Sequence, residues 1–319
     1  EDHVLWTGWP GMYGMAYSSL ALDEADLIIA LGMRFDDRIT GNVEKFSSKS
    51  KKIHVDIDPS EIGKIISVDV PIVGDVKDVL KKLNKVVDSS THGDWLKRIE
   101  TLKEDHPSLR LPDTDKLLAR QVIKDISEVT KGNATIVTGV GQHQMWAAQH
   151  YEFKNPCSLL TSGGSGTMGY EVPAAMGAQV AKPDGTVWSI AGDGGFQMTL
   201  CELATIVENK LPVKFAILNN GFLGMVRQWQ EIFFESSYVS TGYSGNPDFV
   251  KLAEAYGIKG IRVTDKTQVK TAIEEAMEHD GPVLIDFIVE QEENVYPMIP
   301  SGMTVKDMME EPSSERVTV

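Results

Sequence analysis

Short apolar runs that end in Gly, Asp or Asn recur along this chain, separated by polar segments of helical character. Examples are residues 25–32, 52–58, 186–191 and 213–219. Runs of this kind, joined by crossover segments, are typical of buried strands in parallel sheets that have helices on both faces. The sequence therefore predicts an α/β protein with doubly wound, mostly parallel sheets.

The apolar runs fall into two groups. Residues 1–87 have the pattern of the C-terminal part of one α/β domain, and the polar segment 88–111 is interpreted as a linker. The pattern resumes over residues 112–300, where we expect a second α/β domain, and residues 301–319 are expected to be a mobile tail. The chain starts without Met and in the middle of the first pattern, so we interpret it as a fragment.

Composition argues against several classes of protein. Lys and Arg number 31 against 46 Asp and Glu, and the formal charge of -15 argues against nucleic-acid binding by bulk charge. No apolar run approaches the roughly 18 residues of a membrane span. Cys157 and Cys201 lie far apart in apolar surroundings. We therefore expect two buried thiols in a cytoplasmic protein.

Two polar motifs each follow a predicted strand. Gly192-Asp193-Gly194 follows the run 186–191, and Asn220 lies 27 residues after Asp193, at the end of the next run. A strand, a crossover helix and a parallel strand use about that length, so both side chains are expected at one carboxyl edge. Their oxygens suit Mg²⁺, and the glycine amides suit a diphosphate at a helix start. Either motif alone is more often a turn, but together they predict a Mg²⁺-bound diphosphate.

Gly-Asp-Gly followed by Asn-Asn at this spacing resembles the cofactor motif of thiamine-diphosphate-dependent decarboxylases and carboligases. The flanking segments 139–147, 166–170 and 219–230 are similar to the catalytic subunit of the acetohydroxyacid synthase (acetolactate synthase) family. Residues 31–41 and 296–302 extend the similarity nearly end to end. The resemblance implies a central FAD-associated domain over residues 1–87 and a thiamine-diphosphate-binding domain over residues 112–300.

The resemblance also implies roles for residues at matching positions. The Mg²⁺ ligands would be Asp193, Asn220 and Phe222. Thiamine diphosphate would contact Gln142, His143, Gly166, Met168, Gly192, Gly194, Gly195, Gly224 and Met225. Substrate would contact Met198 and Trp229, the latter favouring 2-oxobutyrate. FAD would contact Pro10, Gly11, Met12, Tyr13, Gly32, Met33, Arg34, Phe35, Asp36, Asp56, Ile57, Asp75 and Val76, where Tyr13 replaces the usual His of the family.

The resemblance implies a transferase that condenses pyruvate with pyruvate or 2-oxobutyrate, releasing CO₂, in the biosynthesis of valine, leucine and isoleucine. Its cofactors would be thiamine diphosphate, Mg²⁺ and a structural FAD. Its partners would be a second copy, as a homodimer or tetramer, and a small regulatory subunit, with no nucleic acid and no membrane. The family's activating Glu belongs to an N-terminal domain that precedes this chain. We therefore assign no catalytic residue here and expect no activity from the chain alone.

Two alternatives are weighed against this interpretation. Another thiamine-dependent enzyme, such as an oxo-acid decarboxylase, would share both short motifs but should lack the segments 35–41 and 224–229, which are present. A non-catalytic cofactor-binding module should have lost its metal pair. Asp193 and Asn220 are both present, which favours the enzyme.

Overall fold

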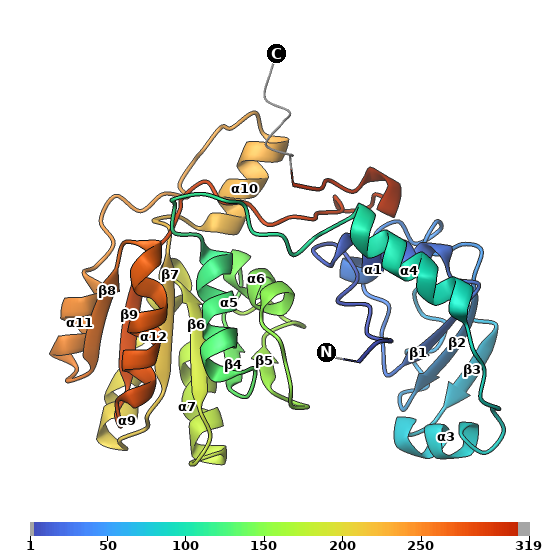
Figure 1. Cartoon of the computed structure of the whole chain (residues 1–319), viewed down its shortest axis with the longest axis horizontal. Helices are drawn as coiled ribbons and strands as arrows, with labels where there is room; N and C mark the ends of the chain where they lie inside the picture. Colours follow the sequence, from blue (N-terminus) through green and yellow to red (C-terminus); the bar gives the residue numbers. More distant parts are fainter. Residues whose placement is uncertain (1–2, 312–319) are drawn as a thin grey trace. The chain divides into compact units, whose positions relative to one another are not determined.

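A computed structural model describes residues 3–311 and divides them into two compact units, each described here by itself (Figure 1). The large unit comprises residues 111–295, and the small unit comprises residues 3–110 together with 296–311. Residues 296–311, which the sequence assigned to the second domain and the tail, thus group with the small unit. The rest of the expected tail, 312–319, lies outside the described residues.

The large unit is built on a six-stranded sheet with the strand order β5-β4-β6-β7-β9-β8 (Figure 1). Every neighbouring pair of strands in it is parallel, as the sequence predicts. The chain runs from β4 outward to β5 and then returns to β6 on the other side of β4, so the switch point lies between β4 and β6. The strands are β4 (Thr135–Thr138), β5 (Leu159–Thr161), β6 (Val187–Gly192), β7 (Lys214–Asn219), β8 (Lys259–Val263) and β9 (Val283–Ile288).

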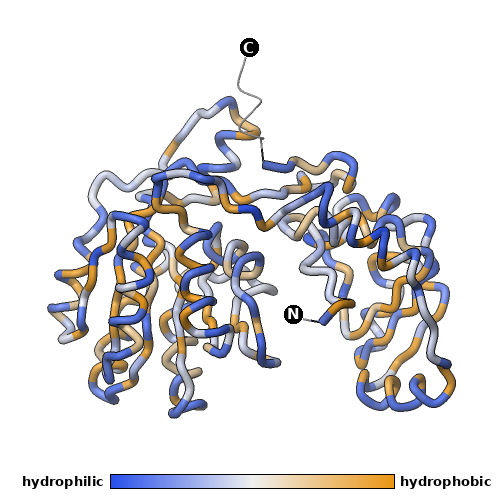
Figure 2. The backbone as a smooth tube through the Cα atoms, viewed as in Figure 1, coloured by the Kyte–Doolittle hydropathy of each residue, from blue (hydrophilic) through white to orange (hydrophobic). Residues whose placement is uncertain are grey.

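Helices cover both faces of this sheet. The buried core on one face joins β4, β6, β7 and β9 to α7, α9 and α11, and Phe196, Phe215 and Phe249 pack edge to face in it with centroids 5.8 and 5.9 Å apart. The helices α5, α6 and α12 pack together on the other side. Figure 2 shows hydrophobic and hydrophilic residues alternating along the outer helices. The helices are α5 (Ala119–Thr130), α6 (Gln142–His150), α7 (Glu171–Ala181), α8 (Asp193–Phe196), η1 (Leu200–Glu202), α9 (Leu203–Glu208), α10 (Gly224–Phe233), α11 (Phe249–Ala255), η2 (Lys266–Gln268) and α12 (Val269–Glu278).

The small unit contains a parallel three-stranded sheet with the order β1-β2-β3. Its strands are β1 (Leu27–Leu31), β2 (Lys51–Asp56) and β3 (Val70–Val73), and its helices are α1 (Ala16–Glu24), α2 (Asp37–Thr40), α3 (Val76–Leu83), α4 (Gly93–Asp105) and η3 (Val305–Asp307). Helix α4 lies within the expected linker but packs on α1 through Ile99 and Leu102. Arg98 on α4 donates two hydrogen bonds to Glu24 on α1, at 2.8 and 2.6 Å. The segment 88–105 is therefore part of the small unit.

The segment 296–311 completes the small unit. The amide of Ile299 donates to the carbonyl of Met12 at 2.8 Å, and Asn42 donates to the carbonyl of Met303 at 2.9 Å. Met298 and Met309 exchange backbone hydrogen bonds, and the Met298 side chain is fully buried. The core of the small unit thus needs residues from both ends of its sequence.

Two statements on composition can be compared with the structure. Cys157 and Cys201 are free thiols but both are exposed, so the expectation of buried thiols is wrong. Cys157 sits in a turn with a positive φ of 54°, beside the equally exposed Pro156. Within residues 3–311 no helix has the length and apolar composition needed to cross a membrane.

Candidate functional site

A pocket of about 230 Å³ opens at the carboxyl ends of β4, β6 and β7 in the large unit. The starts of α6, α8 and α10 border it, so three helix N-termini face one space. Eleven of the predicted residues line it: Gln142, His143, Met168, Gly192, Asp193, Gly194, Gly195, Asn220, Phe222, Gly224 and Met225. The crossover spacing therefore brought the two motifs together as predicted.

Asp193 is buried at the end of β6, and its two carboxyl oxygens accept different numbers of hydrogen bonds. Oδ2 accepts from the amide of Gly221 at 3.0 Å and from Asn246 Nδ2 at 2.6 Å, whereas Oδ1 accepts from the amide of Gly194 at 3.1 Å. Burial raises the pKa of the Asp193 carboxyl to about 6, although these hydrogen bonds lower it in part. A divalent cation at Oδ1 would offset the cost of burying the ionised form.

Asn220 is held in place by neighbours that sequence reasoning assigned to the cofactor. Its Nδ2 donates to Gln142 Oε1 at 3.3 Å, and its Oδ1 accepts from the amide of Phe222 at 3.0 Å. Gln142 in turn donates to Gln228 Oε1 and to the carbonyl of Glu293, both at 3.0 Å. A Cβ at Gly224 would overlap Gln142 Oε1 and approach Asn220 Nδ2 to 2.7 Å, so a larger residue here would displace these two side chains. Gln142 therefore orients Asn220 here.

His143 offers a polar atom to the pocket. Its side chain is buried at the start of α6, and its Nε2 makes no hydrogen bond within residues 3–311. Burial lowers the pKa of His143 to about 4, so the imidazole is neutral at pH 7. A neutral imidazole can donate one N–H, and an anion in the pocket would satisfy the unpartnered Nε2.

The charges around the pocket decide which ligands it accepts. Among the described residues that line it there is no Lys or Arg, while Asp193 contributes a carboxylate. An anion would therefore be repelled unless a cation bridges it to Asp193. Within residues 3–311 no group of three or more His, Cys, Asp or Glu side chains could hold that cation alone. A cation bound at Asp193 would therefore need amide oxygen, backbone oxygen and oxygens of the ligand as its other donors, a set that Mg²⁺ prefers.

Three predicted residues lie outside this lining: Gly166, Met198 and Trp229. Met198 is 56% exposed and lies two residues after the end of α8. Trp229 lies on α10, half-buried, with its ring 5.2 Å from that of Phe233. The structure therefore does not bring the two predicted substrate contacts into the pocket that holds Asp193.

Sequence reasoning missed two groups around the site. The apolar walls of the pocket come from Val140, Met145, Trp146, Leu218, Leu223, Val226 and Val289. Asn246 hydrogen-bonds to Asp193 from a loop that carries no strand or helix pattern. The apolar periodicity of α10 signals a buried helix face but not a pocket wall, and no local signal identifies Asn246.

The predicted FAD residues of the small unit gather mainly where its strands end. Gly32 donates to the carbonyl of Val55 at 2.8 Å, and Gly74 donates to the carbonyl of Asp56 at 2.9 Å. This places the residues after β1, β2 and β3 along one carboxyl edge. Gly32 adopts a positive φ of 64°, and a Cβ there would meet only Val76, at 3.8 Å, which leaves space at this edge. Asp75 caps α3, and Arg34 pairs with Asp36 at 3.0 Å.

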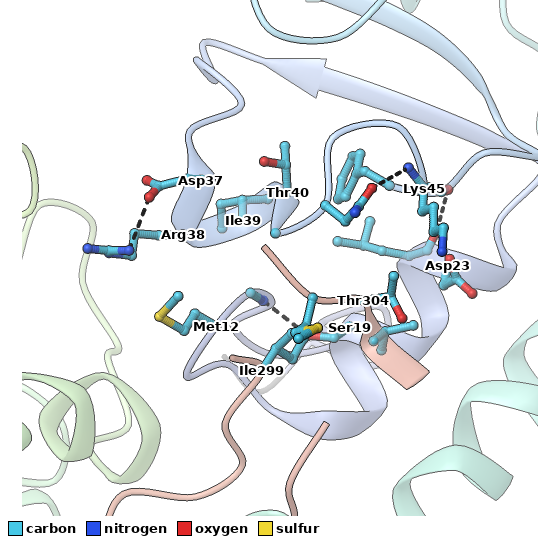
Figure 3. A pocket seen from close by; sticks show the side chains of 18 residues that line it. Met12, Ser19, Asp23, Asp37, Arg38, Ile39, Thr40, Lys45, Ile299 and Thr304 are labelled. Atoms are coloured by element: carbon cyan, nitrogen blue, oxygen red, sulfur yellow. Dashed lines mark hydrogen bonds and ion pairs between the residues drawn. The ribbon is translucent and has the colours of Figure 1, made fainter. Parts of the chain in front are cut away.

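A second, smaller pocket of about 50 Å³ lies elsewhere in the small unit (Figure 3). Figure 3 shows Met12, Ile39 and Ile299 on its walls, and Thr304 comes from the segment that follows residue 295. Of the predicted FAD residues, only Gly11 and Met12 line it. Its size admits a few water molecules rather than a nucleotide.

Comparisons with known proteins decide the family. Residues 139–287 match the thiamine pyrophosphate enzyme C-terminal TPP binding domain, and residues 1–83 match the thiamine pyrophosphate enzyme central domain. The chain belongs to the thiamine pyrophosphate enzymes. The first match contains Asp193, Asn220 and every residue that lines the pocket except Val289. Thiamine pyrophosphate is the cofactor that the sequence predicted under the name thiamine diphosphate.

Within this family the chain is a homologue of acetolactate synthase large subunits. It is 47% identical to the acetolactate synthase large subunit of Corynebacterium glutamicum over 97% of this chain and 51% of that protein. It is 46% identical to the chloroplastic acetolactate synthase 1 of Zea mays, over 94% of this chain and 49% of that protein. It is likewise 46% identical to the acetolactate synthase of Mycobacterium bovis, over 95% of this chain and 51% of that protein. The chain spans about half the length of these relatives.

Proposed function

We propose that the pocket binds thiamine diphosphate through Mg²⁺ and that the chain contributes the cofactor-binding half of an acetolactate synthase. One observation carries the proposal: Asp193 lies in a pocket whose described lining contains no Lys or Arg. A diphosphate therefore needs a bridging cation there, and the neighbouring amide and helix starts suit that pair. The relatives named acetolactate synthase support the reaction class.

Each residue around the pocket has a defined part in this proposal. Asp193 Oδ1, Asn220 Oδ1 and the Phe222 carbonyl would hold Mg²⁺, while the neutral His143 would donate its Nε2 hydrogen to the diphosphate. Met168 would pack beneath the thiamine. The apolar walls would exclude water from the reacting carbon. Thiamine diphosphate, when bound, supplies an electron sink that lets a 2-oxo acid lose CO₂.

The substrates follow from the family. Pyruvate would condense with a second pyruvate or with 2-oxobutyrate, which feeds the biosynthesis of branched-chain amino acids. Met198 and Trp229 stay predicted substrate contacts, and a functional test of them needs the complete enzyme. We assign no catalytic acid or base to this chain. An assay of the chain with pyruvate, thiamine diphosphate, Mg²⁺ and FAD should give no acetolactate, and sustained turnover would contradict that prediction.

The proposal extends to a second cofactor and to partners. FAD would bind along the carboxyl edge of β1, β2 and β3, where Gly32 leaves space for a ligand. Absorbance near 450 nm in the purified chain would report it. Relatives named large subunits support a small-subunit partner, and a homodimer or tetramer stays a prediction. A cytoplasmic location also stays a prediction, because one of the relatives named above is chloroplastic.

Binding of the cofactor tests the proposal directly. Trp146 lines the pocket, so its fluorescence should be quenched as thiamine diphosphate is added in the presence of Mg²⁺. We expect EDTA to abolish the quenching and Asp193→Ala to weaken binding about 100-fold or more, because the variant loses the charged metal ligand. Asp184→Ala, at an exposed turn after α7, is the matched control. Equal affinity in Asp193→Ala and the unaltered chain would refute the proposal.

A further inference from the structure

Asn246 reaches the candidate metal site from the loop between α10 and α11. Its Nδ2 donates to Asp193 Oδ2 at 2.6 Å and also lies 3.2 Å from Asn219 Oδ1. Gln197 Nε2 donates to Asn246 Oδ1 at 3.2 Å, so the orientation of the amide is fixed from its other side. One asparagine thus connects the ends of β6 and β7.

The hydrogen bonds continue from Asn219 across the sheet. Asn219 Nδ2 donates to Asp286 Oδ1 at 2.9 Å, and Arg262 Nε donates to Asp286 Oδ2 at 3.2 Å. Arg262 also donates to Asp248, two residues after Asn246 on the same loop. Because β6, β7, β9 and β8 are neighbours in the sheet, these side chains form one connected row over four strand ends. Both ends of the row meet the short segment 246–248.

This row has a chemical consequence at Asp193. Oδ2 accepts two hydrogen bonds, from Gly221 and Asn246, which occupy its lone pairs. Within the described residues Oδ1 accepts one, from Gly194, and keeps one lone pair. The carboxylate is therefore fixed in rotation with a single oxygen left for a ligand. A carboxylate held in this way loses little conformational entropy when a cation binds.

We propose that Asn246 is a positioning residue for the metal site: it holds Asp193 through Oδ2 so that Oδ1 alone faces the cation. This inference rests on the proposed function, since it assumes that the pocket binds a divalent cation with thiamine diphosphate. It predicts that Asn246 sets the affinity for the cation without touching it. A loop anchor with a merely structural role would instead affect folding and leave metal affinity unchanged.

The test measures Mn²⁺ as a paramagnetic substitute for Mg²⁺. Loss of the electron paramagnetic resonance signal of free Mn²⁺ is followed as the chain is titrated at a fixed, saturating concentration of thiamine diphosphate. For Asn246→Ala we expect the half-saturating Mn²⁺ concentration to rise about tenfold, with full occupancy restored at high Mn²⁺. The matched control is Asn209→Ala, an exposed asparagine at the end of α9, which should titrate like the unaltered chain. Melting temperatures in EDTA should agree between the variants.

The outcomes separate the two proposals. If the unaltered chain and Asn246→Ala bind Mn²⁺ equally, the inference is wrong while the proposed function stands. If the unaltered chain shows no saturable Mn²⁺ binding, the proposed function fails first and the inference with it. Should Asn246→Ala fail to fold, Gln197→Leu removes the donor that orients the Asn246 amide. It should raise the half-saturating Mn²⁺ concentration severalfold, and an unchanged value would overturn the inference.

Discussion

Glu171 is the most unusual single residue of the large unit. Its side chain is fully buried at the start of α7, and neither carboxyl oxygen makes a hydrogen bond within residues 3–311. Burial raises the pKa of this carboxyl to about 7. The amides of Gly169 and Glu171 lie near it but outside hydrogen-bonding geometry, so they lower its pKa only in part. A Cβ at Gly195 would come within 2.8 Å of Glu171 Oε1, so the carboxyl lies directly behind the glycine turn of the pocket.

The titration of Glu171 should make stability depend on pH. The folded carboxyl has a pKa of about 7 against an ordinary value of 4.5, so the folded state binds more protons between these pH values. The free energy of unfolding should therefore fall as the pH rises from 4.5 to 7. Glu171→Gln removes this dependence and should be more stable than the unaltered chain at pH 8, by up to about 3 kcal/mol.

Urea unfolding of the two proteins at pH 5 and at pH 8 would measure this difference. Glu208→Gln, at an exposed position on α9, serves as the control and should change stability equally little at both pH values. A Glu171→Gln effect that is the same at pH 5 and pH 8 would contradict the prediction.

The sequence predicts part of the site at this scale. Asp193 and Asn220 could be placed together because each ends a strand, and parallel strands one crossover apart share an edge. Glu171 and Asn246 could not be placed. Glu171 follows no strand, and Asn246 reaches Asp193 through a loop whose course depends on packing rather than on periodicity.

Among the elements, the strands were the most predictable. β1, β2, β3, β4, β6, β7 and β9 follow apolar runs. In β4, β6, β7 and β9 the reason is burial on both faces, which makes a strand read as continuous apolar sequence, whereas alternate residues of β1 and most of β3 are exposed. β8 reads Lys-Gly-Ile-Arg-Val and lies at the sheet edge, where Val263 is its one buried residue. Helices α6 and α7 were missed for a related reason: they are packed on most sides and carry no clear polar face.

The segment 296–311 yields a prediction for an element rather than a residue. Met298 is fully buried in the small unit, so Met298→Ala should lower the stability of that unit by about 2–5 kcal/mol through the cavity it creates. Met303→Ala, in the same segment but 50% exposed, is the control and should cost far less. Calorimetry would show the loss as a lower melting temperature for one transition only. Equal effects of the two variants would indicate that the segment does not share the core.

At the scale of the whole molecule, the two units of the described chain have separate cores. The large unit packs around Phe196, Phe215 and Phe249, and the small unit packs around Met15 with Leu102 and around Phe35 with Ile66. We therefore expect two thermal unfolding transitions rather than one.

Thiamine diphosphate with Mg²⁺ should raise the melting temperature of the transition that belongs to residues 111–295. A ligand at 100 times its dissociation constant stabilises the unit that binds it by about 2.7 kcal/mol. The melting temperature of the other transition, which Met298→Ala lowers, should not change when the ligand is added. The two effects together assign each transition to its unit. Asp193→Ala should abolish the ligand-induced shift, and a shift that persists in this variant would place binding elsewhere.

The division of the small unit between residues 3–110 and 296–311 also bears on how the chain folds during synthesis. The ribosome makes the 185 residues of positions 111–295 between the two parts. At about 5–20 residues per second, roughly 10 to 40 s pass before Met298 and Ile299 emerge. During that interval the first part stays without the strand-like segment that closes its core, and the large unit can fold first. Residues made after the large unit thus complete a unit that was begun before it.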